Sequence, residues 1–438
     1  MAILTKEEAR QILEKVLSFS KADECTVSLT GTQGGNIRYA RNEVSTSGEE
    51  TNRNLTILSS FGKRSGTASI NEFDDASLEK VVRRAEELAK LAPENPEFVS
   101  ILGPQQYAES AAFFDSTANI NPEFRAKVAE NSIVPATQKD VTAAGFLQHS
   151  SGFDSMMNSK KLFAYQKNSN VDFTVTMRTS DGQGSGWASR DFNDASKLNA
   201  AEASEIAIQK AVNSRAAKAI EPGKYTVILE PAAAVTLIDN MMSNFNARTA
   251  DEGRSFLSKP GGKNKLNEKI VDERVTIYTD PMDPNLPGST WTNEGLPRTR
   301  TEWIKNGVVQ KLYYDRFWAS QKGAEAVAPP NNIIMQGGTG SLEDLIKGTE
   351  RGVLVTRLWY IRAVDPQTLL YTGLTRDGTF YIENGQIKYP VKNFRFNESP
   401  VIMLNNLDAL GKPQRVEGNL IPPMRIRDFT FTSLSDAV

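Results

Sequence analysis

Residues 62–77 read GKRSGTASINEFDDAS and residues 182–196 read GQGSGWASRDFNDAS, so one pattern occurs twice in the chain. The two copies are offset by 120 residues until one residue drops out near Glu72. A strand-like run precedes each copy, because NLTILSS lies over TVTMRTS, and a helix-like run follows each. A long internal repeat of this kind predicts a duplicated α–β unit, built from a helix, strands, a hairpin and a second helix.

The Gly-Ser-Gly phrase at residues 184–186 allows two interpretations. Glycines with positive φ are typical of hairpin turns. Glycine-rich loops also bind phosphate, but such a loop needs the N-terminus of a helix directly after it. Here a strand-like phrase, WAS or TAS, stands between the glycines and the helix, so we favour the turn.

Changes of pattern along the chain predict an α+β fold with three domains. We expect the first α/β unit at residues 1–110 and its repeat at residues 111–221. Residues 222–438 read mainly as strands, with one helical segment at about 231–247.

The C-terminal part carries strong signals for strands. Asn-Gly pairs at 306–307 and 384–385 lie between alternating runs, which is the pattern of tight hairpins. Residues 352–364, GVLVTRLWYIRAV, read as one long strand. We therefore expect a β-rich, barrel-like or sandwich-like C-terminal domain.

The composition excludes several classes of protein. A net charge of −2 over 438 residues provides no basic surface for nucleic acid or for an anionic membrane. No apolar run approaches the ~18 residues of a membrane-spanning helix, and the N-terminal residues lack the pattern of a signal peptide. We expect a cytoplasmic protein, and the single cysteine, Cys25, fits a reducing compartment.

The scarcity of histidine restricts the chemistry further. His149 is the only histidine, so zinc sites with two or three imidazoles are excluded. Catalysis by a Ser–His or Cys–His pair would have to use His149, which has no acidic residue near it in the sequence. We favour a structural or merely exposed His149 and a buried, unreactive Cys25.

One decapeptide near the middle of the chain, TLIDNMMSNF at residues 236–245, places polar residues on an apolar background. The polar residues are Asp239, Asn240 and Asn244. They mark either a ligand-binding helix or the wet face of an ordinary helix.

A Pro- and Gly-rich loop contains three further carboxylates, Asp280, Asp283 and Glu294. They could bind a cation or a peptide amine. We favour the simpler interpretation, in which the aspartates form turns before proline and Glu294 faces solvent.

Arginines gather around the long predicted strand. Arg351, Arg357, Arg362 and Arg376, together with Trp359, could line a cleft that holds peptide carboxylates. On a strand, Arg357 and Trp359 share one face and Arg362 takes the other. Pairing of the arginines with Asp365 and Asp377 inside the fold is the alternative that remains open.

Several long phrases resemble the TldD/PmbA family, whose members are historically labelled modulators of DNA gyrase. The family's third domain is similar to ERGVLVTRLWYIRAVDP (350–366), GLTRDGTFYIENGQI (373–387), FRFNES (394–399) and PPMRIRDFTFTS (422–433). Its DPxxPG…DEGxPT stretch resembles TDPMDPNLPGSTWTNEGLPRTRT (279–301), and its second domain resembles GSGWASRDFNDAS. The phrases occur in family order and cover nearly the whole chain.

The resemblance implies proteolysis. Catalytic, TldD-like members carry HExxxH on a helix and a later Cys, which hold zinc, and the Glu is the general base. Residues 237–244, LIDNMMSN, fall onto that motif, with Asp239 at the first His, Asn240 at the Glu and Asn244 at the second His. Asparagine is a poor zinc ligand and cannot act as a general base near neutral pH. The late Cys is missing, because Cys25 lies in the wrong block.

The chain therefore resembles the PmbA/TldE-like branch, and we expect no catalytic residue, cofactor or metal on it. As the resemblance implies, it would be a non-catalytic subunit of a heteromeric metallopeptidase that processes or degrades unfolded peptides. Zinc would sit on a TldD-like partner in a homo- or heterodimer, without nucleic acid or membrane. Extended peptides would add to strand edges, with Arg357, Trp359, Arg376 and Glu294 as cleft residues.

Two alternatives stay open. One is a self-sufficient metal-dependent peptidase or hydrolase, with Asp239, Asp280, Asp283 and Glu294 as oxygen ligands. The other is a homodimeric peptide-binding scaffold that has no peptidase partner.

Overall fold

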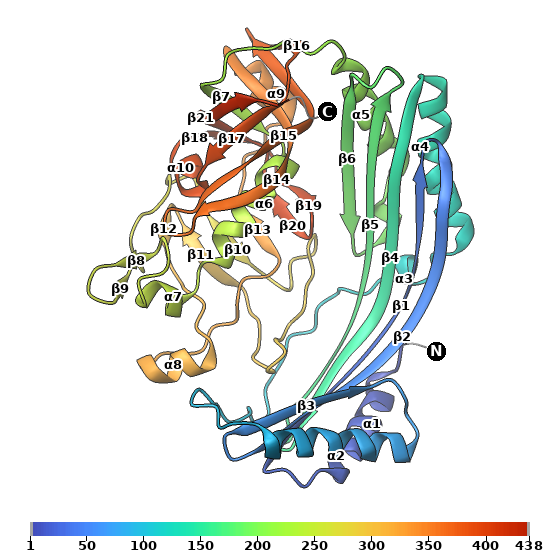
Figure 1. Ribbon diagram of the computed structural model, residues 1–438, viewed down its shortest axis with the longest axis vertical. Coiled ribbons are helices and arrows are strands. Elements are labelled where there is room, and N and C mark those ends of the chain that lie inside the picture. Colours follow the sequence, from blue (N-terminus) through green and yellow to red (C-terminus); the bar gives the residue numbers. More distant parts are fainter. Residues whose placement is uncertain (1–2, 436–438) are drawn as a thin grey trace.

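The computed structural model describes residues 3–435 and has the α+β architecture that the sequence predicts (Figure 1). An α–β region forms the N-terminal half, and a β-rich region containing a five-stranded barrel forms the C-terminal half. Within residues 3–435, no helix combines the length and the apolar character that crossing a membrane needs.

The N-terminal half consists of two units with nearly the same order of elements. The first unit comprises α1 (Lys6–Phe19), β1 (Glu24–Ala40), β2 (Glu43–Phe61), β3 (Arg64–Ile70) and α2 (Asp75–Leu91). The second comprises α3 (Asp115–Ala118), α4 (Pro122–Gln138), β4 (Val141–Asn158), β5 (Phe163–Thr179), β6 (Ser185–Phe192), the 3-10 turn Ala195–Lys197 and α5 (Ala200–Asn213).

The two units share one antiparallel sheet with the strand order β3-β2-β1-β4-β5-β6. The join is the pairing of β1 with β4, which runs in register from Thr26 opposite Asn158 to Tyr39 opposite Gly145. In Figure 1, α1 and α2 cover one end of the long strands and α4 and α5 the other. The sheet therefore buries two separate apolar cores, one under each pair of helices.

The repeated phrase that predicts the duplication forms a hairpin in both units. Gly62 and Gly182 occupy the turns, with φ of +55° and +71°. The Gly-Ser-Gly phrase itself lies past the turn, so the prediction that its glycines need positive φ is wrong. A strand follows each turn directly, as β3 or β6.

Glycine is required in this phrase for a different reason, which is the close packing of strand on helix. A Cβ atom on Gly66 of β3 would lie 2.2 Å from the backbone nitrogen of Ala89 in α2. A Cβ atom on Gly186 of β6 would lie 2.1 Å from the carbonyl oxygen of Ala207 in α5. In both units the helix backbone touches the strand at this glycine, which leaves no room for a side chain.

The C-terminal half contains the remaining elements. They are β7 (Lys224–Leu229), α6 (Pro231–Ser243), α7 (Ala247–Asp251), β8 (Ser258–Lys259), β9 (Lys263–Asn264), β10 (Ile277–Thr279), β11 (Thr301–Lys305), β12 (Val308–Val309), α8 (Arg316–Lys322), β13 (Ile333–Met335), α9 (Leu342–Lys347), β14 (Arg351–Asp365), β15 (Leu370–Glu383), β16 (Gln386–Pro390), β17 (Phe394–Glu398), α10 (Pro400–Asn405), β18 (Leu407–Leu410), β19 (Gln414–Val416), β20 (Asn419–Ile421) and β21 (Met424–Leu434).

Five strands of this half close into a ring. The order is β14-β7-β21-β17-β15, and β15 pairs again with β14. A second sheet, β12-β11-β10-β13-β20-β19, packs with the ring and α6 on one large apolar core. The predicted Asn-Gly turns are confirmed between β11 and β12 and between β15 and β16. The expectation of one helical segment is too simple, because α6 is followed by four more short helices among the described residues.

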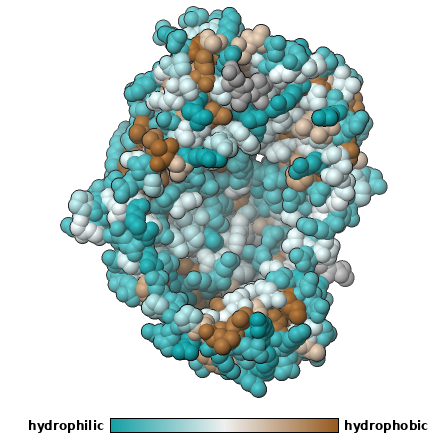
Figure 2. All heavy atoms as spheres, in the orientation of Figure 1, coloured by the Kyte–Doolittle hydropathy of each residue, from teal (hydrophilic) through white to brown (hydrophobic). Residues whose placement is uncertain are grey.

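The two halves face each other across a hollow, which Figure 2 shows near the middle of the molecule. Charged side chains tie the halves together beside it. Arg248 of α7 donates to both carboxylate oxygens of Glu97 at 2.7 and 2.8 Å. Arg415 of β19 donates to Asp191 of β6 at 2.8 Å. The relative position of the halves is therefore fixed by specific contacts from both.

The strand–helix contact predicts the effect of one methyl group. We expect Gly66→Ala to lower the free energy of unfolding by about 1–3 kcal/mol, because the strand must move away from α2. Gly48→Ala in β2 is the matched control, since no atom lies within 4 Å of its Cβ position. It should change stability by less than about 0.5 kcal/mol. Urea denaturation of both variants measures the difference, and equal effects would contradict the packing argument.

Candidate functional site at the open face of α6

The helix α6 is buried on most sides and open on one. Its apolar residues pack into the large core, among them Leu237, Ile238 and Met241, each 0% exposed. Asp239 is exposed on the opposite side and Asn240 is half-buried. Pro231 at the first turn and β7 directly before it set where the helix begins. The predicted polar residues thus do mark the wet face of α6, and that face borders the hollow between the halves.

A small pocket of about 240 Å³ adjoins this face. It is formed by residues of four regions: Ala232 and Thr236 of α6, residues 357–361 of β14, Trp187 of β6, and Glu417 from the turn between β19 and β20. Its walls are therefore aromatic and charged, and they come from both halves of the molecule.

A stack of guanidinium and indole groups builds one wall. The Arg357 guanidinium lies 4.7 Å from the ring centre of Trp187 and 5.2 Å from that of Trp359. Arg376 stacks on Trp359, also at 5.2 Å. Cation–π contacts of this kind hold the planar groups in fixed orientations. Arg357 and Trp359 share one face of β14 as predicted, because the guanidinium of Arg357 lies over the ring of Trp359.

The buried carboxylate of Asp377 holds the Arg357 guanidinium of this stack in place. Asp377 is 0% exposed and accepts a hydrogen bond from the Arg357 Nε at 2.5 Å. Ser185 of β6 donates to the other carboxylate oxygen. Burial lowers the pKa of Arg357, while the charge of Asp377 acts in the opposite direction. Arg357 thus pairs with Asp377 inside the fold, which is one of the two predicted roles, and it also lines the pocket. Binding of peptide carboxylates by Arg357 stays a prediction.

Three carboxylates of the site have raised pKa values. Partial burial raises the pKa of Asp239. Burial also raises the pKa of Asp172 on β5, and the nearby charge of Asp191 adds to this. The pKa of Glu417 is raised by burial and by the charges of Asp172 and Asp191, against the effect of Arg357. Asp172, Asp191 and Glu417 therefore place several carboxylates close together.

The donor set on α6 does not fit zinc. The side-chain amide of Asn244 donates to the backbone oxygen of Asn240 at 2.8 Å, so it caps the helix end. Asp239 supplies a single carboxylate, whereas zinc in proteins is held by three or four His, Cys or carboxylate ligands. Among residues 3–435, no three side chains of these types come together in a way that could hold a metal ion.

The two residues that composition singles out lie away from α6. His149 of β4 is buried, with its Nε2 3.2 Å from the Nη1 of Arg125. Arg125 also donates to Glu49 at 2.8 Å. Cys25 is buried in the first unit, and burial raises the pKa of its thiol. His149 is thus part of a packed polar cluster in the sheet.

Of the loop carboxylates, none joins Asp239 in a ligand set. Asp280 and Asp283 accept hydrogen bonds from backbone nitrogens two residues on, each at 2.9 Å, which is the turn role we favour. Glu294 lies in a separate pocket of about 230 Å³ with Arg316, 3.9 Å from it. The predicted cleft set is therefore split, with Arg357, Trp359 and Arg376 together and Glu294 in another pocket.

Family models match both halves of the chain. The model of the PmbA/TldA metallopeptidase C-terminal domain matches residues 222–433, and that of domain 1 matches residues 25–89. Together they span more than half of the sequence.

The chain belongs to the TldD/PmbA family.

Individual family members are distant in sequence. A protein named metalloprotease from Methanothermobacter thermautotrophicus is 25% identical over 48% of this chain, and the match spans 47% of that protein, about half its length. Metalloprotease PmbA of Escherichia coli O157:H7 is 20% identical over 97% of this chain and 98% of its own. The crystal structure of TldE from Thermococcus kodakarensis superposes with a TM-score of 0.87 at 19% identity, covering 97% of this chain and 99% of that one. At this identity the structural likeness establishes the TldD/PmbA fold.

Sequence reasoning missed Trp187, Asp191 and Glu417. The repeat offers one signal for Trp187, because the first copy has Thr67 at the matching position and a tryptophan there is unexplained by a strand alone. Glu417 has a left-handed φ of +48° in a tight turn, and no local pattern indicates that this turn reaches the pocket.

The buried pair in the wall predicts a large cost for its disruption. We expect Arg357→Met to lower the free energy of unfolding by about 3–5 kcal/mol, because Asp377 loses its main counter-charge in a buried position. Arg362→Met, at an exposed residue five positions along the same strand, is the control and should cost less than about 0.5 kcal/mol. Thermal and urea denaturation give both values. A loss below about 1 kcal/mol for Arg357→Met would show that the buried carboxylate of Asp377 is tolerated without the guanidinium of Arg357.

The single histidine predicts a pH dependence. Burial and the charge of Arg125 lower the pKa of His149 from 6.5 to about 4. Between these values the unfolded chain binds a proton that the folded chain does not, so stability must fall as the pH falls. We expect the wild-type protein to lose about 2 kcal/mol more than His149→Gln between pH 7.5 and pH 5 in urea denaturation. All carboxylates are common to both proteins, and parallel pH profiles would contradict the low pKa.

Proposed function

We propose that this chain is a non-catalytic, PmbA/TldE-like subunit of a metallopeptidase, which holds extended peptides at α6 for a TldD-like, zinc-bearing partner. The observation that carries the proposal is the open face of α6. It combines an amide-capped helix end with a pocket of stacked aromatic and guanidinium groups. Such a face can bind a peptide, but it lacks the groups that would cleave one.

The first support is chemical. Cleavage of a peptide bond needs an activated water molecule, from a metal ion or a general base with a suitable pKa. Asn240, at the position that the family resemblance gives to the general base, cannot take up a proton near neutral pH. The side-chain amide of Asn244 donates to the backbone oxygen of Asn240 at the end of the helix. Asp239 would have to activate the water molecule by itself, without an imidazole or a metal ligand beside it.

The second support is a strand edge. β7 pairs with β14 only from Val353 to Val355. Farther along β14, Trp359 and Tyr360 are 44% and 56% exposed, and within residues 3–435 no strand pairs with that edge. An extended peptide can add to such an edge through backbone hydrogen bonds, which do not depend on its sequence. The aromatic side chains next to it supply apolar contact area.

The third support comes from the family. Relatives bear the names metalloprotease PmbA and TldE, and one archaeal relative is named a zinc metalloprotease TldD homolog. A family with both kinds of member supports a division of labour, in which the zinc lies on another chain. We accordingly assign no metal or cofactor to this chain.

The proposal predicts peptide binding without cleavage. We expect the purified chain to bind a fluorescent, unstructured peptide and to leave it intact, and a TldD-like family member from the same cell to cleave it when added. Trp359→Ala should weaken binding about tenfold, as loss of an interface aromatic does. Leu91→Ala is the control, since Leu91 is 82% exposed on α2 and away from the site.

The same measurements identify the alternatives. Cleavage by the isolated chain that is lost with a chelator or with Asp239→Ala would overturn the proposal in favour of a self-sufficient hydrolase. Peptide binding with no TldD-like protein recovered on repeated co-purification from the native cell would favour a homodimeric scaffold.

A further inference from the structure

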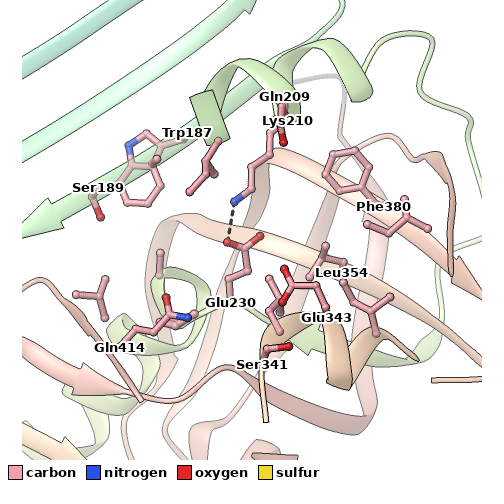
Figure 3. A pocket seen from close by; sticks show the side chains of 18 of the residues that line it. Trp187, Ser189, Gln209, Lys210, Glu230, Ser341, Glu343, Leu354, Phe380 and Gln414 are labelled. Atoms are coloured by element: carbon pink, nitrogen blue, oxygen red, sulfur yellow. Dashed lines mark hydrogen bonds and ion pairs between the residues drawn. The ribbon is translucent and has the colours of Figure 1, made fainter. Parts of the chain in front are cut away.

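A second, larger cleft lies between the two halves, next to the pocket at α6. It has a volume of about 1060 Å³. Its lining comes from α5 and β6 on one side and from α9, β14, β15 and β16 on the other, with the first turn of α6 at the bottom. Figure 3 shows Trp187 and Ser189 on one side of it and Phe380 and Leu354 on the other.

A lysine and a glutamate meet on the floor of this cleft. Lys210 of α5 and Glu230, which precedes α6, point toward each other, with Nζ and Oε2 2.7 Å apart (Figure 3). Their side chains are only 16% and 14% exposed. Thr356 donates to the other oxygen of Glu230 at 3.2 Å, so both oxygens of this carboxylate have partners.

Lys210 keeps spare hydrogen-bonding capacity. An ammonium group has three donors, and within residues 3–435 its Nζ donates to Glu230 alone. A half-buried ammonium with unused donors at the floor of a cleft favours an oxygen ligand that carries negative charge. The N-terminal end of α6, which lines the cleft at Pro231 and Ala232, adds the positive end of a helix dipole.

One wall of the cleft is apolar, and the lining carries more basic than acidic residues. Leu354 and Phe380 belong to a buried apolar cluster, against which Leu342 and Ile346 also pack. Ile387, at the rim, is 46% exposed. Among the lining residues, five are basic and three are acidic. The ligand that fits this lining has a carboxylate next to an apolar group.

The cleft is continuous with the pocket at α6. Trp187 and Ala232 line both, and β14 borders both, with Leu354 in the cleft and Arg357 in the pocket. Three residues of extended chain span about 10 Å. A peptide bound at Arg357 therefore needs only a few further residues to reach the cleft, and it leaves the edge of β14 where β7 begins to pair at Val355.

We propose that this cleft binds the C-terminal residue of the peptide, with the terminal carboxylate on Lys210 and an apolar side chain against Leu354 and Phe380. The inference rests on the proposed function and adds to it a substrate class, namely peptides with a free C-terminus and an apolar last residue. Lys210 recognises the charge, and the apolar wall recognises the side chain.

The test compares two peptides that differ in one group. The same N-terminally labelled, unstructured peptide ending in Phe is prepared as the free acid and as the C-terminal amide, and fluorescence anisotropy gives its affinity for the full chain. We expect the acid to bind about tenfold more tightly, as a charge-assisted hydrogen bond implies. In Lys210→Met the preference should disappear. In Lys388→Met, at an exposed lysine on the rim of the same cleft, it should persist.

Lys210→Met leaves Glu230 buried without its counter-charge, which can disturb folding. The double variant Lys210→Met/Glu230→Gln removes both charges, keeps the acceptor for Thr356, and should likewise bind acid and amide equally. Equal binding of acid and amide by the wild-type chain would overturn the inference and leave the proposed function standing. A preference that survives in the double variant would overturn the role of Lys210. If neither peptide binds, the inference and the proposed function both fall.

Discussion

The pairing of β1 with β4 is the contact on which the rest of the molecule depends. It makes one sheet of two similar units, and it runs from Thr26 opposite Asn158 to Tyr39 opposite Gly145. A shift by one residue would turn every side chain to the other face. The register of this one pairing therefore decides where the first unit lies relative to the second, whose edge strand β6 presents Ser185, Trp187 and Asp191 to the C-terminal half.

Those three residues of β6 form one of the contact regions between the halves. Ser185 reaches Asp377 under the arginine stack, Trp187 packs on Arg357, and Asp191 pairs with Arg415. Asp377 and Asp191 are both buried. A buried carboxylate that loses its partner is costly, so the pair of Asp191 with Arg415 favours this arrangement of the halves. The same contacts form the wall shared by the pocket at α6 and the large cleft, so the geometry that joins the halves also shapes both cavities.

Much of the fold can be predicted from the sequence because its signals are local. The repeat around Gly66 and Gly186 indicates the duplication, and the Asn-Gly pairs indicate two of the hairpins. Asp239 and Asn240 stand out as polar residues on an apolar helix, and Arg357 and Trp359 as neighbours on one strand face. Each of these patterns is complete within a few residues of the chain, so no knowledge of the packing is needed.

The rest of the site depends on contacts between residues far apart in the sequence. Glu417 reaches the pocket from a tight turn, and Trp187 reaches it from the other half of the molecule. Glu294, which the sequence groups with Arg357 and Trp359, lies in a different pocket. The cleft at Lys210 exists only because α5 and the barrel meet. Periodicity and propensity carry no information on such meetings, since they describe one element at a time.

The glycines at positions 66 and 186 have a consequence for how a duplicated protein can diverge. Loops, charges and even whole functions can drift apart between two copies of a unit without harm to either. A place where the backbone of a helix rests on the backbone of a strand admits no substituent, so neither copy can change there while the layers stay in contact. We therefore expect the two units to stay alike at these glycines even where their side chains differ elsewhere.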